Sequence, residues 1–403
     1  MKNCIVAQSG GPTSVINASV IGLFEKNLKE NFFDKVYGGI NGIEGVLKEE
    51  LVNLNEVSKS DIDLFLHTPS AGLGSCRYKL STYEKDDTDY KRLFEVFEKY
   101  QIKTFFYIGG NDSQDTIYKL SEYAKLNNLT KTNFIGIPKT VDNDLMEIDH
   151  TPGFGSAARY ISTSVLESYL DSLVYSENGI FITETMGRDT GWLAGSACLA
   201  RYNGKQCADI ILLPEVPFNE ERFLDKVRKI YNDKKHVYIV ISEGTRTKDG
   251  EFLSSTKAHS HDSFGHTQLG GAGNALKNIV VDAGITQRVK VLELSVLQRS
   301  AFHLASKVDH KEAYALGENA LNLARDEENG VVSVLKRKSN SPYEVNYTKA
   351  PAANIANKVK YMPKNYISED GFDVTKEAYE YFYPLVDKLP EYRVFHNYHN
   401  KND

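Results

Sequence analysis

Residues 104–113 read TFFYIGGNDS and residues 134–144 read FIGIPKTVDND, and these two stretches decide the fold. Each begins with a short aromatic or β-branched run and ends in turn residues, a pattern typical of a buried strand. Residues 112–129, which join them, have the apolar spacing of a helix. The resulting strand-helix-strand unit predicts a parallel pair, so both polar loops open at the carboxyl edge of the sheet, where ligands bind.

Further short apolar runs alternate with helical patterns along the rest of the chain. Such alternation predicts α/β layers with largely parallel sheets. We expect further strands at 4–7, 36–40, 64–67, 180–183, 209–213, 236–241, 289–294 and, as the last strand, 331–335. We expect further helices from about 14 and at 89–100, 156–175, 191–200, 219–235 and 311–326.

Composition restricts the class of protein. The chain has 403 residues, 41% hydrophobic and 25% charged, which is typical of a soluble globular protein with room for two domains. A net charge of -6 argues against a general nucleic-acid or anionic-membrane binder. No apolar run approaches the roughly 20 residues that cross a bilayer.

Cysteine usage and the N-terminus indicate a cytoplasmic location. The four cysteines, Cys4, Cys76, Cys198 and Cys207, form no CxxC pair, so they predict reduced thiols and no zinc site. Met1 to Cys4 runs directly into a predicted strand, so we expect no signal peptide.

Two glycine-rich loops have features of a phosphate site. Gly10-Gly11 lies between a predicted strand and a predicted helix, where backbone N–H groups and the helix dipole favour an anion. Residues 70–77 place small residues ahead of Arg77, which can act as a charge clamp. A plain tight turn and a solvated Arg77 are the alternatives, and for Arg77 the local pattern slightly favours solvation.

The acidic loop suggests a base and a metal. Thr140, Asp142 and Asp144 alternate, and in an extended segment alternate side chains face one way. One carboxylate can then accept a hydroxyl proton while another holds Mg²⁺ beside phosphate. A surface turn with solvated aspartates is the alternative. No Walker A or dinucleotide fingerprint is present, so glycine loops, arginines and acidic residues together indicate phosphoryl transfer of another type.

Two segments carry weaker signals. Residues 261–274 are rich in glycine and polar groups and are interpreted as a substrate-facing loop. Residues 350–403 are tyrosine-rich, with helical stretches near 353–359 and 375–385. This last segment shows no recognisable chemistry and is interpreted as a helical extension packed over the domains.

The combination of these loops resembles the phosphofructokinase family, which phosphorylates fructose 6-phosphate. The resemblance runs in order from the first strand to about Leu335. It rests on Gly10-Gly11, Gly74-Ser75-Cys76-Arg77, Gly109-Gly110-Asn111-Asp112-Ser113, Pro138-Lys139-Thr140-Val141-Asp142-Asn143-Asp144, Met186-Gly187-Arg188, Ser242-Glu243-Gly244 and Gln298-Arg299.

The resemblance implies roles for these residues. Asp142 would deprotonate the 1-hydroxyl of the sugar phosphate and Arg188 would neutralise transition-state charge, with Lys139 and Asp112 at the donor. Mg²⁺ would be held by Asp144 and Asn111. The substrate-binding residues would be Gly11, Arg77, Thr140, Val141, Met186, Gly187, Glu243, Arg288 and Arg299.

The resemblance also implies two Rossmann-like, three-layer α/β domains with the active site in the cleft between them. Residues 1–150 with about 298–349 would hold the phosphoryl donor, and 151–297 the sugar phosphate. Residues 350–403 would be the C-terminal extension. Members form homodimers or homotetramers.

Asp112 and Lys139 bear on the choice between ATP and pyrophosphate. Most ATP-using members resemble Gly-Gly-Asp-Gly-Ser, with glycine where this chain has Asp112, and a carboxylate there crowds and repels a nucleotide α-phosphate. Lys139 can bind pyrophosphate, and can pair with Asp112 when the site is empty. Both residues resemble the pyrophosphate-dependent branch, although some ATP-using relatives also carry the lysine.

Three positions depart from the family pattern. Asn111 replaces a usual metal-associated aspartate, Gly179 replaces an arginine given to a neighbouring subunit, and Val296 replaces a histidine. Arg288 and Lys290 are candidates to rebuild the 6-phosphate clamp, and Arg288 would act from within the chain or from a neighbouring subunit.

We therefore expect a Mg²⁺-dependent, reversible transfer of phosphate from pyrophosphate to fructose 6-phosphate in the cytoplasm. The alternatives are the same reaction with ATP, or a non-catalytic sugar-phosphate-binding regulatory subunit. Intact Thr140, Asp142, Asp144 and Arg188 favour an enzyme.

Overall fold

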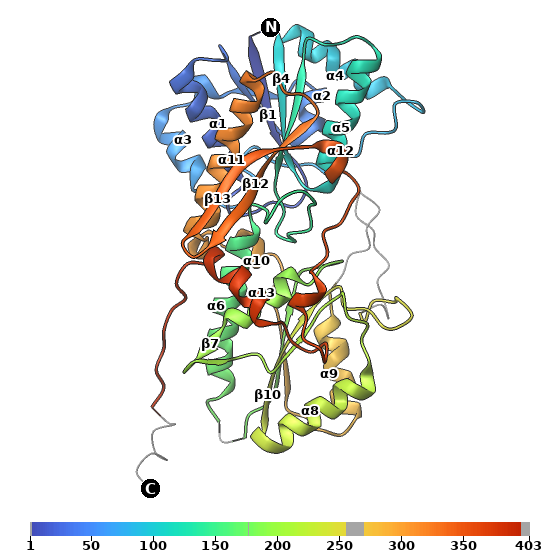
Figure 1. Ribbon diagram of the computed structural model, residues 1–403, viewed down its shortest axis with the longest axis vertical. Coiled ribbons are helices and arrows are strands. Elements are labelled where there is room, and N and C mark those ends of the chain that lie inside the picture. The colour runs from blue at the N-terminus through green and yellow to red at the C-terminus, as the bar shows by residue number, and fades with distance from the viewer. Residues whose placement is uncertain (1, 176, 255–269, 396–403) are drawn as a thin grey trace.

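Two sheets with helices on their faces organise the chain. The computed structural model describes residues 2–175, 177–254 and 270–395. The larger sheet has seven strands in the order β13-β12-β5-β4-β1-β2-β3, and the smaller has four in the order β11-β6-β10-β9. The larger sheet and its helices form the upper half of Figure 1, and the smaller sheet forms the lower half.

The larger sheet is parallel in its interior and antiparallel at both edges, where β3 pairs with β2 and β13 pairs with β12. Strand β4 (IKTFFYIG) is buried at nearly every position, as expected of a central strand covered on both faces. The strands are β1 (Asn3–Gln8), β2 (Val36–Gly39), β3 (Leu51–Asn53), β4 (Ile102–Gly109), β5 (Asn133–Pro138), β12 (Val331–Asn340) and β13 (Tyr343–Pro351).

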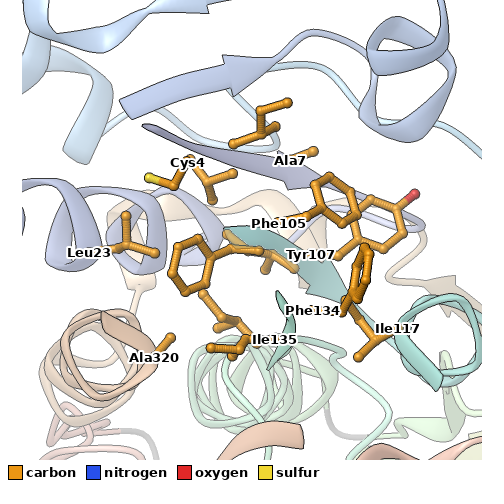
Figure 2. Close-up of a cluster of buried hydrophobic side chains, with 14 of the residues drawn as sticks. Cys4, Ala7, Leu23, Phe105, Tyr107, Ile117, Phe134, Ile135 and Ala320 are labelled. Atoms are coloured by element: carbon orange, nitrogen blue, oxygen red, sulfur yellow. The ribbon is translucent and has the colours of Figure 1, made fainter. Parts of the chain in front are cut away.

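Helices cover both faces of this sheet. Leu23 and Ala320 lie on one side of the strands in Figure 2, and Tyr107 and Ile117 lie on the other. The first side is formed by α1 (Ile16–Glu30) and α11 (Lys307–Arg325), and the second by α2 (Gly42–Leu47), α4 (Thr88–Lys99) and α5 (Asn111–Leu126). Helix α3 (Lys59–Leu66) packs beside α1.

The smaller sheet is parallel throughout and separates two apolar clusters. Tyr238 and Val240 of β10 pack on the side of α6 and α7, whereas Val237 and Ile239 pack on the side of α8 and α9, because successive side chains of a strand point to opposite faces. The elements are β6 (Gly179–Thr185), β9 (Ile210–Leu212), β10 (His236–Ser242), β11 (Val289–Glu293), α6 (Phe154–Ser172), α7 (Trp192–Ser196), α8 (Glu220–Lys234) and α9 (Ala272–Asp282).

The remaining elements are short. Strands β7 (Arg201–Tyr202) and β8 (Lys205–Gln206) form a small hairpin, and α10 (Leu297–Ser300) follows β11. Of the C-terminal helices, α12 (Ala352–Ile355) packs on α5 and α13 (Lys376–Phe382) packs on α7. Single 3-10 turns lie at Leu54–Glu56, Ala197–Leu199, Phe302–Leu304, Lys364–Tyr366 and Tyr383–Leu385.

The predicted α/β class with largely parallel sheets is confirmed. The strand predicted at 64–67 is wrong, whereas the strand predicted at 331–335 is present as the first half of β12. Residues 64–66 are the last turn of helix α3 and His67 follows it. The first turn of this helix is capped by the Ser58 hydroxyl, which accepts from the Asp61 N–H at 3.1 Å. The strand predicted at 331–335 is not the last, because β12 continues to Asn340 and turns back as β13.

Three other predictions are only partly confirmed or are not tested. Of the loop predicted at 261–274, residues 261–269 lie outside the described residues and Ala272 already begins α9. The helix expected near 353–359 ends at Ile355. The division into domains stays a prediction, and no described helix is both long and apolar enough to cross a membrane.

Candidate active site

A cavity of about 500 Å³ lies where the carboxyl ends of strands from both sheets meet. Loops after β1, β4 and β5 form one wall, and loops after β6 and β10 form the opposite wall, as expected of parallel strands that deliver their ligand groups to one edge. The predicted site residues that line it are Gly11, Arg77, Asn111, Asp112, Lys139, Thr140, Val141, Asp142, Asp144, Met186, Arg188, Glu243 and Arg299.

The glycine turn after β1 lies against two cations. Gly10 has a φ of +76°, and a Cβ built there would lie 3.3 Å from the Lys139 Nζ. A Cβ on Gly11 would lie 3.1 Å from Arg299 Nη1, closer than ordinary van der Waals contact. The two glycines therefore let the backbone approach the cavity while both cations keep their places.

Lys139 is buried at the floor of the cavity and donates to the Gly11 carbonyl oxygen at 2.5 Å. Burial lowers the pKa of Lys139 to about 8, against the opposing effect of Asp142. The predicted pairing of Lys139 with Asp112 is wrong. Asp112 pairs instead with Lys79 at 3.2 Å, so the carboxylate in the first turn of α5 has a different lysine as its partner.

Asp142 lies on a turn that is fixed at both of its peptide groups. Its N–H donates to the Thr140 hydroxyl at 3.1 Å, and its carbonyl oxygen accepts from the Thr190 hydroxyl at 3.1 Å. Burial raises the pKa of the Asp142 carboxyl, while the charges of Arg188 and Lys139 act in the opposite direction. Such a carboxylate is a suitable general base, because its proton affinity is increased while it stays close to cations.

Asp144 is the residue best suited to a cation. Its Oδ1 is buried without a hydrogen-bond partner, and burial together with Asp142 raises the pKa of Asp144 to about 7. A nearby divalent cation would remove both penalties. Among the described residues no cluster of three His, Cys, Asp or Glu side chains forms a metal cage, which is compatible with Mg²⁺ held by one or two carboxylates and substrate phosphates.

Asn111 also lines the cavity, but its amide is already engaged. The Asn111 Nδ2 donates to the Lys358 carbonyl oxygen at 2.8 Å, and its Oδ1 accepts from the Lys358 N–H at 3.3 Å. A role for Asn111 as a metal ligand would compete with this pair of bonds.

The acidic loop is not extended, contrary to the reasoning from alternation. Asn143 has a left-handed φ of +54° and is fully buried, so Asp142 and Asp144 reach the cavity from a tight turn. Val141 lines the same cavity, which strict alternation does not allow.

The wall of the cavity also combines the carboxyl group of Glu243 with the guanidinium groups of Arg77, Arg188 and Arg299. Burial, followed by the charge of Asp142, raises the pKa of Glu243 to about 7. Burial and the neighbouring charge of Arg77 lower the pKa of Arg299. A bound anion would offset the effect of Arg77 on the Arg299 guanidinium, as a phosphate site requires.

Two predicted residues do not line this cavity. Gly187 forms a turn with a φ of +126°, and a Cβ there would lie 2.6 Å from the Thr190 carbonyl oxygen. Arg288 precedes β11 at the opposite edge of the smaller sheet, where its Nη1 donates to the Glu177 carbonyl oxygen at 2.7 Å. It lines a separate cavity of about 380 Å³, so the expectation that Arg288 clamps the 6-phosphate within one chain is wrong.

Sequence reasoning missed several residues of the cavity wall, namely Lys79, Asp189, Thr190, Asn357 and Val359. Lys79 follows Arg77 by two positions, so alternation along an extended segment was a usable signal. Asn357 and Val359 belong to the C-terminal segment, which carries no motif, and only the tertiary structure brings them here.

Comparisons with known proteins agree with this geometry. The sequence profile of the family described as Phosphofructokinase matches residues 3–323. A Pyrophosphate--fructose 6-phosphate 1-phosphotransferase of Halomonas elongata is 42% identical over 95% of this chain and 91% of its own length. A protein of the same name from Xanthomonas campestris is 40% identical over 97% and 95%.

A solved structure supports the same family. The pyrophosphate-dependent phosphofructokinase of Marinobacter aquaeolei superposes with a TM-score of 0.85 at 38% identity, covering 98% of this chain and 94% of that one. Since the profile matches most of the chain and the relatives align over nearly its whole length, the chain belongs to the phosphofructokinase family.

Proposed function

We propose that this protein transfers a phosphoryl group from pyrophosphate to the 1-hydroxyl of fructose 6-phosphate, giving fructose 1,6-bisphosphate and phosphate. One observation carries the proposal: Asp142, a buried carboxylate with a raised pKa, shares a single cavity with Lys139, Arg188 and Arg299. A base among cations is what the transfer of an anionic group to a hydroxyl requires. The relatives named above carry this activity in their names.

In the proposed reaction Asp142 accepts the proton of the 1-hydroxyl. The hydroxyl oxygen forms a bond to the terminal phosphorus of pyrophosphate, and the bond from that phosphorus to the bridging oxygen breaks. Lys139 and Arg188 balance the charge that spreads over the transferred group. Arg77 holds oxygens of the phosphoryl donor, and Arg299 holds the 6-phosphate of the sugar. Phosphate leaves with the electron pair of the broken bond.

Asp112 supports pyrophosphate over ATP as the donor. It lies in the first turn of α5, where the helix dipole would otherwise attract a phosphate. It pairs with Lys79, which also lines the cavity. A nucleotide α-phosphate in that place would meet a carboxylate, whereas the two phosphoryl groups of pyrophosphate can stay beside Lys139 and Gly11.

Further features of the proposal concern the metal and the assembly. Mg²⁺ beside Asp144 would neutralise the phosphates, because the unpartnered Asp144 Oδ1 offers an oxygen to a hard cation. We propose a homodimer or homotetramer. Arg288, which lies away from the active-site cavity of its own chain, would contact the 6-phosphate of the sugar bound by a neighbouring subunit. We also propose a reversible reaction and a cytoplasmic location.

A donor assay tests the proposal. Purified protein is supplied with fructose 6-phosphate and Mg²⁺, with either pyrophosphate or ATP, and fructose 1,6-bisphosphate is measured. We expect turnover with pyrophosphate, no comparable turnover with ATP, and the reverse reaction from fructose 1,6-bisphosphate and phosphate. Turnover with ATP alone would contradict the donor assignment, and turnover with neither donor would contradict the activity.

A further inference from the structure

The C-terminal segment 357–362 lies outside residues 3–323, which the family profile matches, and yet it contacts loops from both sheets. Lys358 holds the Asn111 side chain after β4 through its backbone. The Trp192 Nε1–H, after β6, donates to the Lys360 carbonyl oxygen at 2.9 Å. The Met362 N–H donates to Glu215 Oε1 at 3.0 Å. The segment is thus tied to both walls of the cavity.

Lys360 is the centre of these contacts. Its backbone N–H donates to the Asp144 carbonyl oxygen at 2.7 Å. Its Nζ donates to Asn143 Oδ1 at 3.2 Å, to the Ile148 carbonyl oxygen at 3.0 Å and to the Asp149 carbonyl oxygen at 2.7 Å. An ammonium group has three protons to donate, and here all three are directed into the loop that follows β5.

Asn143 explains why this loop needs support. It stands between Asp142 and Asp144 with a left-handed φ of +54°, so its conformation sets the direction of both carboxylates. A non-glycine residue in this region is held there by its surroundings. The Asn143 Oδ1 accepts from the Lys360 ammonium and from the Thr151 N–H at 3.1 Å.

The other half of the Asn143 amide is also held by the C-terminal chain. Its Nδ2 donates to the Tyr381 hydroxyl at 2.9 Å, and that hydroxyl donates to the Asp149 carbonyl oxygen at 2.8 Å. The Lys360 Nζ lies 5.3 Å from the centre of the Trp192 ring, so an aromatic face covers the cation. The C-terminal chain therefore encloses the back of the catalytic turn.

We propose that Lys360 is a positioning residue for phosphoryl transfer, which holds the turn at Asn143 so that Asp142 and Asp144 meet the reacting groups. This inference rests on the proposed function. Lys360 does not line the cavity, and the phosphate-binding arginines Arg77 and Arg299 lie on other elements. Its loss should therefore lower kcat and leave substrate affinity nearly unchanged, because a displaced base acts on the transition state more than on the bound substrates.

The test compares Lys360→Met with Lys364→Met, a matched loss of an exposed lysine four residues further along the chain. With pyrophosphate and fructose 6-phosphate, we expect Lys360→Met to lower kcat by about 10- to 100-fold, the range for a catalytic group misplaced by about an ångström. The KM for each substrate should stay within about threefold, and Lys364→Met should match the wild type.

Two further readouts separate positioning from folding. Amide hydrogen exchange in residues 140–151 should rise in Lys360→Met while exchange in the strands of the larger sheet stays constant. Lys360→Arg, which keeps the charge and the donors, should recover part of the lost kcat. If Lys360→Met does not fold, Tyr381→Phe carries the test, because it removes only the hydroxyl that Asn143 contacts.

The outcomes distinguish the inference from the proposed function. A wild type that is inactive with pyrophosphate refutes the proposed function. An active wild type with an unchanged kcat in a folded Lys360→Met, or in Tyr381→Phe where that variant carries the test, overturns the inference alone. A rise in KM without a fall in kcat also overturns it, since Lys360 would then act on binding.

Discussion

Raising the pH from about 6 to about 9.5 should remove about 3 kcal/mol of folding stability that His150 supplies. His150 is buried between two carboxylates, with Nδ1 at 2.7 Å from Asp149 Oδ1 and Nε2 at 2.7 Å from Glu312 Oε2. Arg337 pairs with Asp149 and the Tyr343 hydroxyl donates to Glu312, so these groups surround the imidazole from four elements of the chain.

The magnitude follows from the balance at this site. Burial disfavours the charged imidazole, but the Glu312 charge and the hydrogen bonds to Asp149 and Glu312 outweigh it and raise the pKa of His150 to about 9. Compared with the ordinary value of 6.5, this difference is worth about 3 kcal/mol at 1.36 kcal/mol per pH unit. Because the folded-state pKa is the higher one, the contribution is complete below 6.5 and disappears as the pH rises through 9.

Urea denaturation of the wild type and of a His150→Gln, Glu312→Gln double variant at both pH values measures this contribution. The double variant removes the charge pair, so titrations elsewhere in the chain cancel in the comparison. We expect the stability difference between the two proteins to shrink by about 3 kcal/mol between pH 6 and pH 9.5. A difference that does not change with pH would refute the reasoning.

Three further predictions concern the cavity. Gly11→Ala should raise the KM for fructose 6-phosphate by up to about tenfold, or about 1.4 kcal/mol of binding, because its methyl group would displace Arg299; an unchanged KM in steady-state assays would contradict this. Asp112→Gly combined with Lys139→Gly should gain measurable turnover with ATP. No turnover with ATP in the same donor assay would contradict the argument that Asp112 crowds the nucleotide α-phosphate. Asp144→Asn should raise the Mg²⁺ concentration for half-maximal rate without weakening metal-free binding of fructose 6-phosphate, as titration calorimetry can check.

Local sequence patterns predict most of the strands and helices. Strand β4 is apolar on both faces and ends at the turn residues Gly109-Gly110. The apolar run therefore predicts the strand, and the glycines predict where it ends. The run at 64–67 does not form a strand, because a short apolar run can also form the last turn of a helix, and the Ser58 cap upstream distinguishes the two. Strand β13 was missed although Tyr343, Val345 and Tyr347 alternate with exposed polar residues, which is the period of a half-buried strand.

Several residues of the cavity were predictable because they follow a strand. Glu243 comes directly after β10 and Asp142 lies in the loop that follows β5, so the carboxyl ends of parallel strands in the two sheets bring both residues to one cavity. Tertiary packing of the C-terminal chain brings Asn357 to the cavity wall and Lys360 to the Asn143 side chain, and no spacing in the sequence encodes these contacts. The partner of Asp112 could not be decided between lysines from the sequence, since Lys79 and Lys139 are both near a phosphate loop and only the backbone path separates them.

The most direct test of the central claim is the kinetic and binding comparison of Asp142→Asn with the wild type, using pyrophosphate as donor. If Asp142 is the base, the variant should lose about 10²- to 10⁴-fold in kcat, the usual contribution of a general base. Calorimetry should show that it still binds fructose 6-phosphate, because Arg299 and Glu243 remain in place. A variant that turns over at the wild-type rate would contradict the account.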